Sequence, residues 1–214
     1  NINTTRAQLA NPVAILANGE AKNKNHSDCT MINVSIAPTW EPTNDFSLTE
    51  KFSYTIQSLD EAYFTPIIGM PTYTLPGNMD ATENSKYSMF SKHNAVFSDT
   101  RADWKILPNG AHRVEVFGGV RFMNDTYRAS YLLADGTGSD KTPNTGSRNR
   151  KITGSDTNWR TLAYYANADY NYMEKYYVSG QLSMETSSRF GKNAGMKMFG
   201  VGWGVFPSIQ GAWV

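Results

Sequence analysis

The sequence predicts an all-β fold: a section of an antiparallel transmembrane β-barrel of about seven strands, with short periplasmic turns and long extracellular loops. Three observations lead to this prediction. Apolar and polar residues alternate over long runs, which is the side-chain period of a β-strand. Short turns alternate with long polar loops, as they do in outer-membrane barrels. Within the strands, nearly every charged residue falls on the polar face, where a barrel interior tolerates charge.

Composition narrows the class of protein without choosing it. The 214 residues carry a net charge of +1, so no general attraction to nucleic acid or anionic lipid is expected. The mean hydropathy is −0.49, and no apolar run reaches the roughly 18 residues of a spanning helix. The single cysteine, Cys29, excludes a scaffold held by internal disulfides. An aromatic content of 13% suits the aromatic girdles of a barrel and a soluble all-β interior equally well.

The chain divides into a leading loop and a barrel part. Residues 1–30 are polar and rich in asparagine, so we expect an extracellular loop that leads into the barrel, with one short helical turn near residues 14–17. Residues 31–214 are expected to form a partial receptor barrel that lacks a plug domain. No charged and apolar leader precedes Asn1, so we expect that a signal peptide has been removed or that the chain is an internal piece of a longer protein.

The first predicted hairpin joins Met31–Trp40 to Phe46–Leu59 across the turn at residues 41–45. Both runs alternate cleanly between apolar and polar residues. Glu50 is the exception, because it falls in the apolar row of the second run. A β-bulge, or a position beyond the membrane, would accommodate it.

Two further hairpins follow, separated by long loops. A loop is expected over residues 60–93, because this segment is irregular and contains three prolines and two glycines. The second hairpin joins residues 94–107 to 111–130 across Pro108-Asn109-Gly110, which has strong turn chemistry. Residues 132–158 form the next expected loop.

The third hairpin has the most regular pattern of all. Residues 162–172 and 176–185 alternate strictly on either side of the turn Met173-Glu174-Lys175. A loop over residues 186–202 and a last strand that ends at Val214 complete the predicted layout.

Three motifs in the C-terminal part resemble the barrel of the SusC/RagA family of TonB-dependent outer-membrane transporters. They are Tyr170-Asn171-Tyr172 with Lys175-Tyr176, then Ser187-Ser188-Arg189-Phe190-Gly191-Lys192-Asn193, then Trp203-Gly204-Val205-Phe206-Pro207-Ser208. The resemblance is specific from about Arg160 to Val214 and lies only in the layout from Met31 to Ser130. Two features depart from the family pattern: Glu185-Thr186 replaces the usual acidic-glycine pair, and the segment between Asn193 and Trp203 is longer.

The resemblance implies a function and a set of partners. Such a transporter is a large barrel with an N-terminal plug, capped by a SusD-like surface lipoprotein, in the outer membrane of Bacteroidetes. It imports oligosaccharides or peptides, driven by TonB. Bacterial barrels of this kind have an even number of strands, so about seven strands do not close. They would leave two unpaired edges, so we expect an internal section of a longer transporter whose TonB-contacting N-terminal part is absent here.

Charged residues on the polar faces of the second hairpin are the candidate site residues: Arg101, Asp103, Lys105, Arg113, Glu115 and Arg121. One interpretation is that they form ordinary cross-strand ion pairs in a wet interior. The other is that some of them hold the plug or line the path of the substrate. Tyr73, Tyr87 and Trp159 are candidate loop aromatics that stack on sugars, and simple packing within the loops is the alternative.

No enzyme, metal or cofactor is expected. The three histidines, His26, His93 and His112, are scattered and lack metal-ligand spacing, and nothing marks a nucleophile elbow. Two other classes of protein remain open at this point. One is a soluble all-β binding or adhesion module, and the other is a passive porin.

Overall fold

The computed structural model describes residues 10–17, 24–69, 84–136, 139–141, 148–190, 196–198 and 200–214. Nearly all of them lie in an antiparallel β-sheet, which confirms the all-β prediction. One short helix, α1 (Pro12–Ala17), precedes the strands, within the segment where a helical turn was expected. The strands are β1 (His26–Ile36), β2 (Thr39–Thr43), β3 (Phe46–Thr65), β4 (Ser85–Leu107), β5 (His112–Asp135), β6 (Arg148–Tyr172), β7 (Tyr176–Ser187), β8 (Met196–Met198) and β9 (Val201–Trp213).

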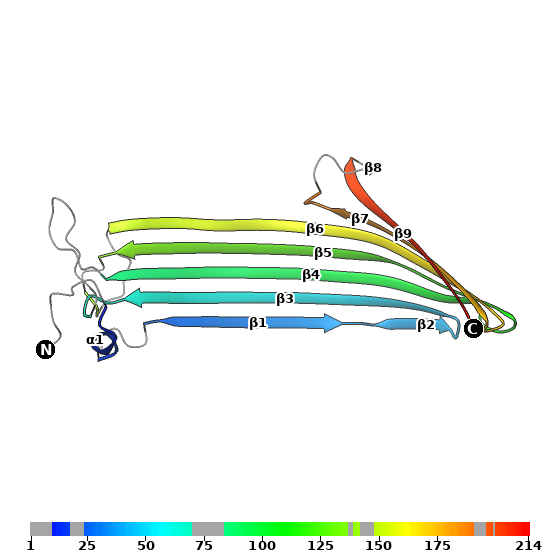
Figure 1. The fold of residues 1–214 in the computed structure, drawn as a ribbon, viewed down its shortest axis with the longest axis horizontal. Helices are drawn as coiled ribbons and strands as arrows, with labels where there is room; N and C mark the ends of the chain where they lie inside the picture. The colour runs from blue at the N-terminus through cyan, green and yellow to red at the C-terminus, as the bar shows by residue number, and fades with distance from the viewer. Residues whose placement is uncertain are drawn as a thin grey trace. The chain divides into compact units, whose positions relative to one another are not determined.

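The strand order is β1-β3-β4-β5-β6-β7-β9-β8, with β2 paired to β3, so each long strand lies beside its neighbour in the chain (Figure 1). This is a meander of hairpins, as the alternating pattern predicted. The described strands do not close into a barrel, because the order begins at β1 and ends at β8.

The residues fall into two compact units. The first unit is Asn1–Met31, Gln57–Lys92 and Tyr127–Asp156, and the second is Ile32–Ile56, His93–Thr126 and Thr157–Val214. The boundary between the units cuts five strands, β1 and β3 to β6. Each unit is described below by itself.

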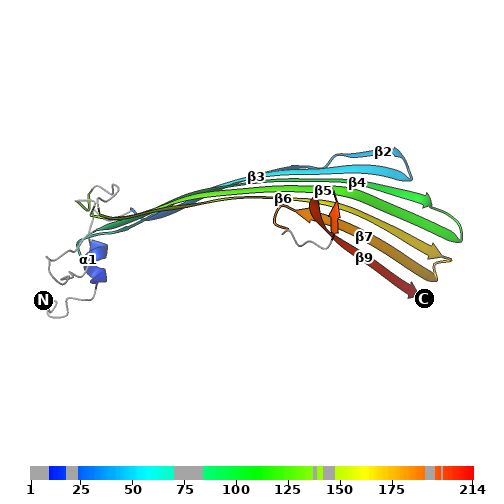
Figure 2. The same cartoon turned by 90° about the horizontal axis from the view of Figure 1, so that it is seen from above.

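Short turns gather at one end of the second unit, where the C-terminus also lies (Figures 1 and 2). Backbone hydrogen bonds link two of these turns to the next hairpin, from Lys105 N–H of β4 to the Asp45 oxygen (2.8 Å) and from Met173 N–H to the Ala111 oxygen (2.7 Å). Gly110 has a φ of 104°, a conformation that glycine adopts freely. The turns at residues 108–111 and 173–175 form as predicted, whereas the turn predicted over residues 41–45 is confined to 44–45 because residues 41–43 belong to β2.

The third hairpin has the predicted register. β6 pairs with β7 without interruption from Thr161↔Ser187 to Tyr172↔Tyr176. β7 in turn pairs with β9 from Tyr176↔Trp213 to Glu185↔Gly204. A continuous ladder keeps the alternation intact, so no strand of this hairpin changes faces along its paired length.

The two faces of the second unit differ sharply in polarity. We call the apolar face the one that carries the even-numbered residues of β3 to β7 and the odd-numbered residues of β9, and the polar face the opposite one. Trp104 is 51% exposed, Leu182 44% and Ile209 82% on the apolar face. Trp203 is the one buried apolar residue among those described in this unit. No second layer of described residues therefore packs against the apolar face.

Several predicted loops are strands in the structure. β3 continues to Thr65 and β4 begins at Ser85, so residues 60–65 and 85–93 of the predicted loop are strand. Likewise, β5 continues to Asp135 and β6 begins at Arg148. These extensions mix polar and apolar residues without a regular period of two, so they lack the alternation by which a strand is recognised. Their backbone ladder forms regardless of the polarity of the side chains.

The predicted strand Met31–Trp40 also differs from the structure. β1 begins at His26, within the segment expected to be a loop, and residues 37–38 separate β1 from β2. Proline lacks the N–H that a ladder needs, so Pro38 interrupts the strand. This break and the three-residue β8 account for nine strands where about seven were predicted.

In the first unit, buried polar groups hold the connections. Asp140 is only 8% exposed, and its carboxylate accepts hydrogen bonds from the backbone N–H groups of Ile67 (2.9 Å) and Ile68 (3.3 Å). The same carboxylate accepts one from the fully buried Asn84 amide (3.2 Å). Asn11 caps α1 by accepting hydrogen bonds from two backbone N–H groups of its first turn. The Asp140 contacts tie the end of β3 to the start of β4 through buried polar groups.

Candidate functional site

The polar face of the second unit carries the candidate site, and an interaction across three strands organises it. Asp99 on β4 is 9% exposed and accepts hydrogen bonds from Arg121 Nη2 on β5 (3.0 Å) and from the Tyr165 hydroxyl on β6 (2.6 Å). Tyr165 therefore reaches across β5 to a strand that is not its neighbour. A buried carboxylate with two charge-assisted or hydroxyl donors is satisfied and held in place.

A glycine on β5 makes this reach possible. A Cβ atom at Gly119 would lie 2.5 Å from Cζ of Tyr165 and 2.7 Å from the carbonyl oxygen of Thr100. Both distances are far below ordinary contact, so no larger residue fits beneath the tyrosine ring. Gly119 thus lets the ring lie flat over β5, which is one reason that a strand interior contains glycine.

A second ion pair lies beside the first. Arg101 on β4 donates to Asp103 on the same strand from Nε (2.9 Å) and from Nη2 (2.6 Å). Its guanidinium also stacks over the Phe117 ring of β5, 3.9 Å from the centroid. The pairing with an acid and the aromatic contact fix a side chain that would otherwise be mobile.

Three of the predicted site residues meet in one hollow. Arg101, Asp103 and Arg121 line a space of about 650 Å³ together with Asp99 and Tyr165. The remaining lining residues are Thr49, Lys51, Phe117, Met123, Thr161, Ala163, Gln181, Ser183 and Glu185. The hollow offers both signs of charge as well as amide and hydroxyl groups, so it suits a polar solute that both donates and accepts hydrogen bonds.

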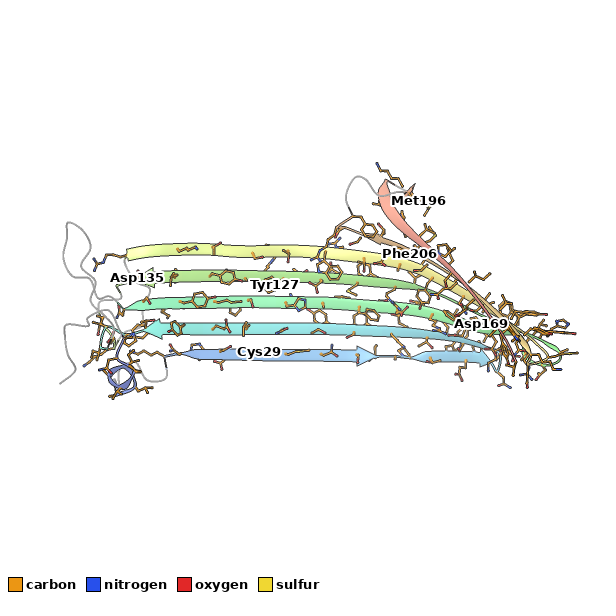
Figure 3. The ribbon with its side chains drawn as sticks, viewed as in Figure 1. Cys29, Tyr127, Asp135, Asp169, Met196 and Phe206 are labelled. Atoms are coloured by element: carbon orange, nitrogen blue, oxygen red, sulfur yellow. The ribbon has the colours of Figure 1, made fainter. Side chains whose placement is uncertain are left out.

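The other predicted residues lie elsewhere on the same face. Arg113 and Glu115 line a second hollow of about 420 Å³, together with Asp169, which is labelled in Figure 3. Arg113 Nη2 lies 2.8 Å from a carboxylate oxygen of Glu174 in the β6–β7 turn. Lys105 lines a third hollow of about 250 Å³. The six charges thus share a face but not a single site.

Sequence reasoning missed the residues that organise the first hollow. Asp99, Gly119 and Tyr165 are absent from the predicted site, although alternation had placed Asp99 on the polar side. The sequence feature that could have indicated this contact is Tyr165 in a polar row, next to a strand that contains the pair Gly118-Gly119. A sequence read strand by strand does not show a contact that skips a strand.

Glu50 keeps the predicted register, and the structure shows what accommodates it. It lies on the apolar face, where its carboxylate accepts hydrogen bonds from the Ser98 hydroxyl (2.7 Å) and the Thr100 hydroxyl of β4. Neither a bulge in β3 at this point nor a change of face is needed, because the neighbouring strand supplies two donors in the same row.

The predicted loop aromatics are not loop residues where the structure describes them. Tyr87 lies in β4 and Trp159 lies in β6, so the assignment of these two to loops was wrong. The strands extend further than their alternation, which is why both were misplaced. The guanidinium of Arg189 lies 4.7 Å from the Trp159 ring centroid. Tyr73 lies outside the described residues.

Other kinds of site receive no support from the described residues. No three His, Cys, Asp or Glu side chains among them come together as metal ligands would. Among the described residues, no helix is long and apolar enough to cross a membrane.

Comparison with known proteins finds the fold but no close relative. No family model and no curated protein matches the chain. Among solved structures, the chain is similar to the RagAB peptide transporter, with a TM-score of 0.70 and 15% sequence identity over 86% of this chain. It is also similar to the RagAB peptide importer in its open-open state (TM-score 0.69, 16% identity) and in its closed-closed state (TM-score 0.69, 15% identity). The chain spans about a fifth of the length of these solved chains, and at this identity the likeness concerns the fold.

Proposed function

We propose that this chain is a section of a TonB-dependent importer of the SusC/RagA type, located in the outer membrane of a Gram-negative bacterium of the Bacteroidetes type. In this proposal, the parent protein takes up oligosaccharides or peptides together with a SusD-like surface lipoprotein. Its role is transport rather than catalysis, and it needs no cofactor.

The observation that carries this proposal is the polarity of the second unit. Its apolar face is exposed over several neighbouring strands, whereas its ion pairs and polar hollows lie on the opposite face. A water-soluble protein rarely leaves so large an apolar surface uncovered. Lipid on one side and a wet interior on the other satisfy both faces, and they are the environment of a barrel strand.

Two further observations agree with a barrel wall. The one carboxylate on the apolar face, that of Glu50, has two hydroxyl donors, as an acid beside hydrocarbon requires. The short turns lie together at one end of the second unit, the arrangement of periplasmic turns. The fold similarity to the RagAB peptide importer supports uptake of a nutrient, and the motifs from Tyr170 to Ser208 support the SusC/RagA type.

Fractionation of cells that express the complete parent protein tests the location. We expect recovery in the outer membrane, extraction only with detergent, and a folded band on unheated gels that shifts on boiling. Recovery in the aqueous extract without detergent would favour the soluble all-β binding module and contradict the proposal.

Uptake measurements test the mechanism. Cells carrying the parent protein are given labelled peptides or oligosaccharides, with and without a functional TonB. We expect uptake that requires TonB and the surface lipoprotein. Uptake that continues at the same rate without TonB would identify a passive porin instead.

A further inference from the structure

One edge of β6 is open although β6 lies in the middle of the strand order. Its neighbours in the sheet are β5 and β7. β7 pairs only with the segment from Thr161 to Tyr172. It then ends in a turn in which Phe190 N–H donates to the Ser187 oxygen (2.9 Å). Among the described strands, none lies on that side of β6 between Arg148 and Trp159.

In the described strand order the place beside β6 belongs to β7, and the two outer edges of the sheet lie beyond β1 and β8. The open edge of β6 is therefore not one of the two edges at which the described sheet would be extended by further strands. An unpaired edge presents a row of backbone donors and acceptors, which is a template for another strand.

The direction of these backbone groups follows from the last contact with β7. Ser188 N–H donates to the Arg160 oxygen, and Arg160 N–H donates to the Ser188 hydroxyl, both at 2.9 Å. The backbone groups of Arg160 thus point toward the open side. Because these groups alternate along a strand, those of the other even-numbered residues, Ile152, Gly154 and Asp156, point the same way.

Side chains leave this edge accessible. Residues 151–154 are all exposed, and Ile152 is 75% exposed. Gly154 has no side chain, and Asp156 turns its carboxylate to Arg128 of β5, with Oδ2 3.1 Å from Nε. A strand approaching from this side would therefore meet backbone groups first.

We propose that the edge of β6 from Lys151 to Asp156 binds an extended peptide by strand addition. A peptide repeats an N–H and a C=O at the spacing of this edge, so it forms a ladder whatever its side chains are. An oligosaccharide has no such repeat. The inference rests on the proposed import function and deepens it, because it selects peptides over oligosaccharides as the substrate class.

The test uses the complete parent protein, purified in detergent, and a fluorescent seven-residue peptide of alternating threonine and serine. Ile152→Pro removes one outward donor and leaves the ladder to β5 intact, because the N–H of residue 152 points away from β5. Ile152→Ala is the matched control, since it removes the side chain and keeps the donor. We expect about tenfold weaker binding for I152P and less than about twofold change for I152A.

A second arm leaves the protein unchanged. The same peptide with an N-methyl group on every residue has no backbone donor on either of its edges, so we expect about tenfold weaker binding. Labelled maltoheptaose serves as the carbohydrate probe and is expected not to compete with the peptide. The heat-shifted gel band shows whether I152P is folded, and the N-methyl arm gives its answer even if it is not.

Several results would overturn the inference. One is equal binding of the N-methylated and the plain peptide, and another is a loss of binding in I152A as large as in I152P. Absence of peptide binding alongside TonB-dependent uptake would refute the edge site and leave the importer standing. Peptide binding at the edge in a protein that supports no uptake would instead refute the proposed function.

Discussion

The two units share the strands β1 and β3 to β6, yet the side chains of these strands are distributed differently in the two units. In the second unit the strands alternate, and one face is apolar and exposed. In the first unit the strands mix polar and apolar residues without regular alternation, and the buried residues include Phe64, Ala129 and Ala134 together with Asn84 and Asp140. Both units have the same backbone ladder, so the difference lies in their side chains. We attribute this difference to the medium that surrounds each unit. Under the proposed function, that medium is hydrocarbon on one face of the second unit and water around the first.

The largest expected effect comes from a charge on the apolar face. Leu182→Arg in the complete parent protein is expected to lower the free energy of unfolding in lipid by roughly 2–4 kcal/mol, because a cation is costly beside hydrocarbon. The matched control is Ile152→Arg in the first unit, an equally apolar but water-exposed position, with an expected change near zero. Urea titration of the folded band in liposomes measures both. Equal losses of unfolding free energy in the two variants would contradict the proposed difference in surroundings between the two units.

Asp140→Ala tests the dependence of the first unit on buried polar contacts. The change leaves buried partners of the carboxylate unsatisfied, including the backbone N–H groups of Ile67 and Ile68, and we expect a loss of about 2–3 kcal/mol in the local opening free energy. Hydrogen exchange at Ile67 and Ile68 reports it. Asp60→Ala, at an exposed acid in the same unit, is the control and is expected to leave exchange unchanged. Slow exchange in the Asp140 variant would show that other contacts hold this connection.

Glu50, the carboxylate on the apolar face, provides a third test of the comparison. Replacing both hydroxyl donors in Ser98→Ala with Thr100→Val leaves the Glu50 carboxylate unsatisfied, and we expect a loss of about 1–3 kcal/mol of unfolding free energy. Adding Glu50→Leu to this pair is expected to restore most of the loss, because no polar group then remains in the row. The measurement is the same urea titration in liposomes. A triple variant no more stable than the double variant would mean that the hydroxyls act in another way.

The smallest expected effect comes from replacing one glycine on each face by alanine. Gly119→Ala crowds the Tyr165 ring and the Thr100 carbonyl on the polar face, and we expect a loss of about 1–2 kcal/mol. Gly180→Ala on the apolar face meets nothing within 4 Å and is expected to be neutral or slightly stabilising. Adding Tyr165→Ala to Gly119→Ala should remove the crowding, so the two changes should be non-additive. Additive losses would indicate that the ring does not lie over Gly119.

The sequence predicts the strands correctly where the two faces of the sheet differ in polarity, and it fails where both faces have similar polarity. Residues 162–172 and 176–185 show strict alternation, and the predicted hairpin agrees with the ladder in its faces and its turn. Arg148 to Asn158 form part of β6 but alternate too weakly to be recognised, because both faces meet water. For the same reason, Tyr87 and Trp159 were expected in loops. Pro38 was read as part of an apolar row, although its missing N–H ends β1.

For the candidate site, the sequence by itself determined which residues share a face, because the side-chain period of a strand is two residues. It placed Arg101, Asp103, Arg121 and the other three candidate charges on the polar faces and kept nearly every charge off the apolar row. Only the tertiary structure decided which strands come close enough for a side chain to cross one of them, as Tyr165 does over Gly119 to reach Asp99. It also decided that Ser98 and Thr100 meet Glu50, and that β7 leaves the edge of β6 open. These contacts depend on the register between strands that are far apart in the chain, and no local pattern of residues encodes it.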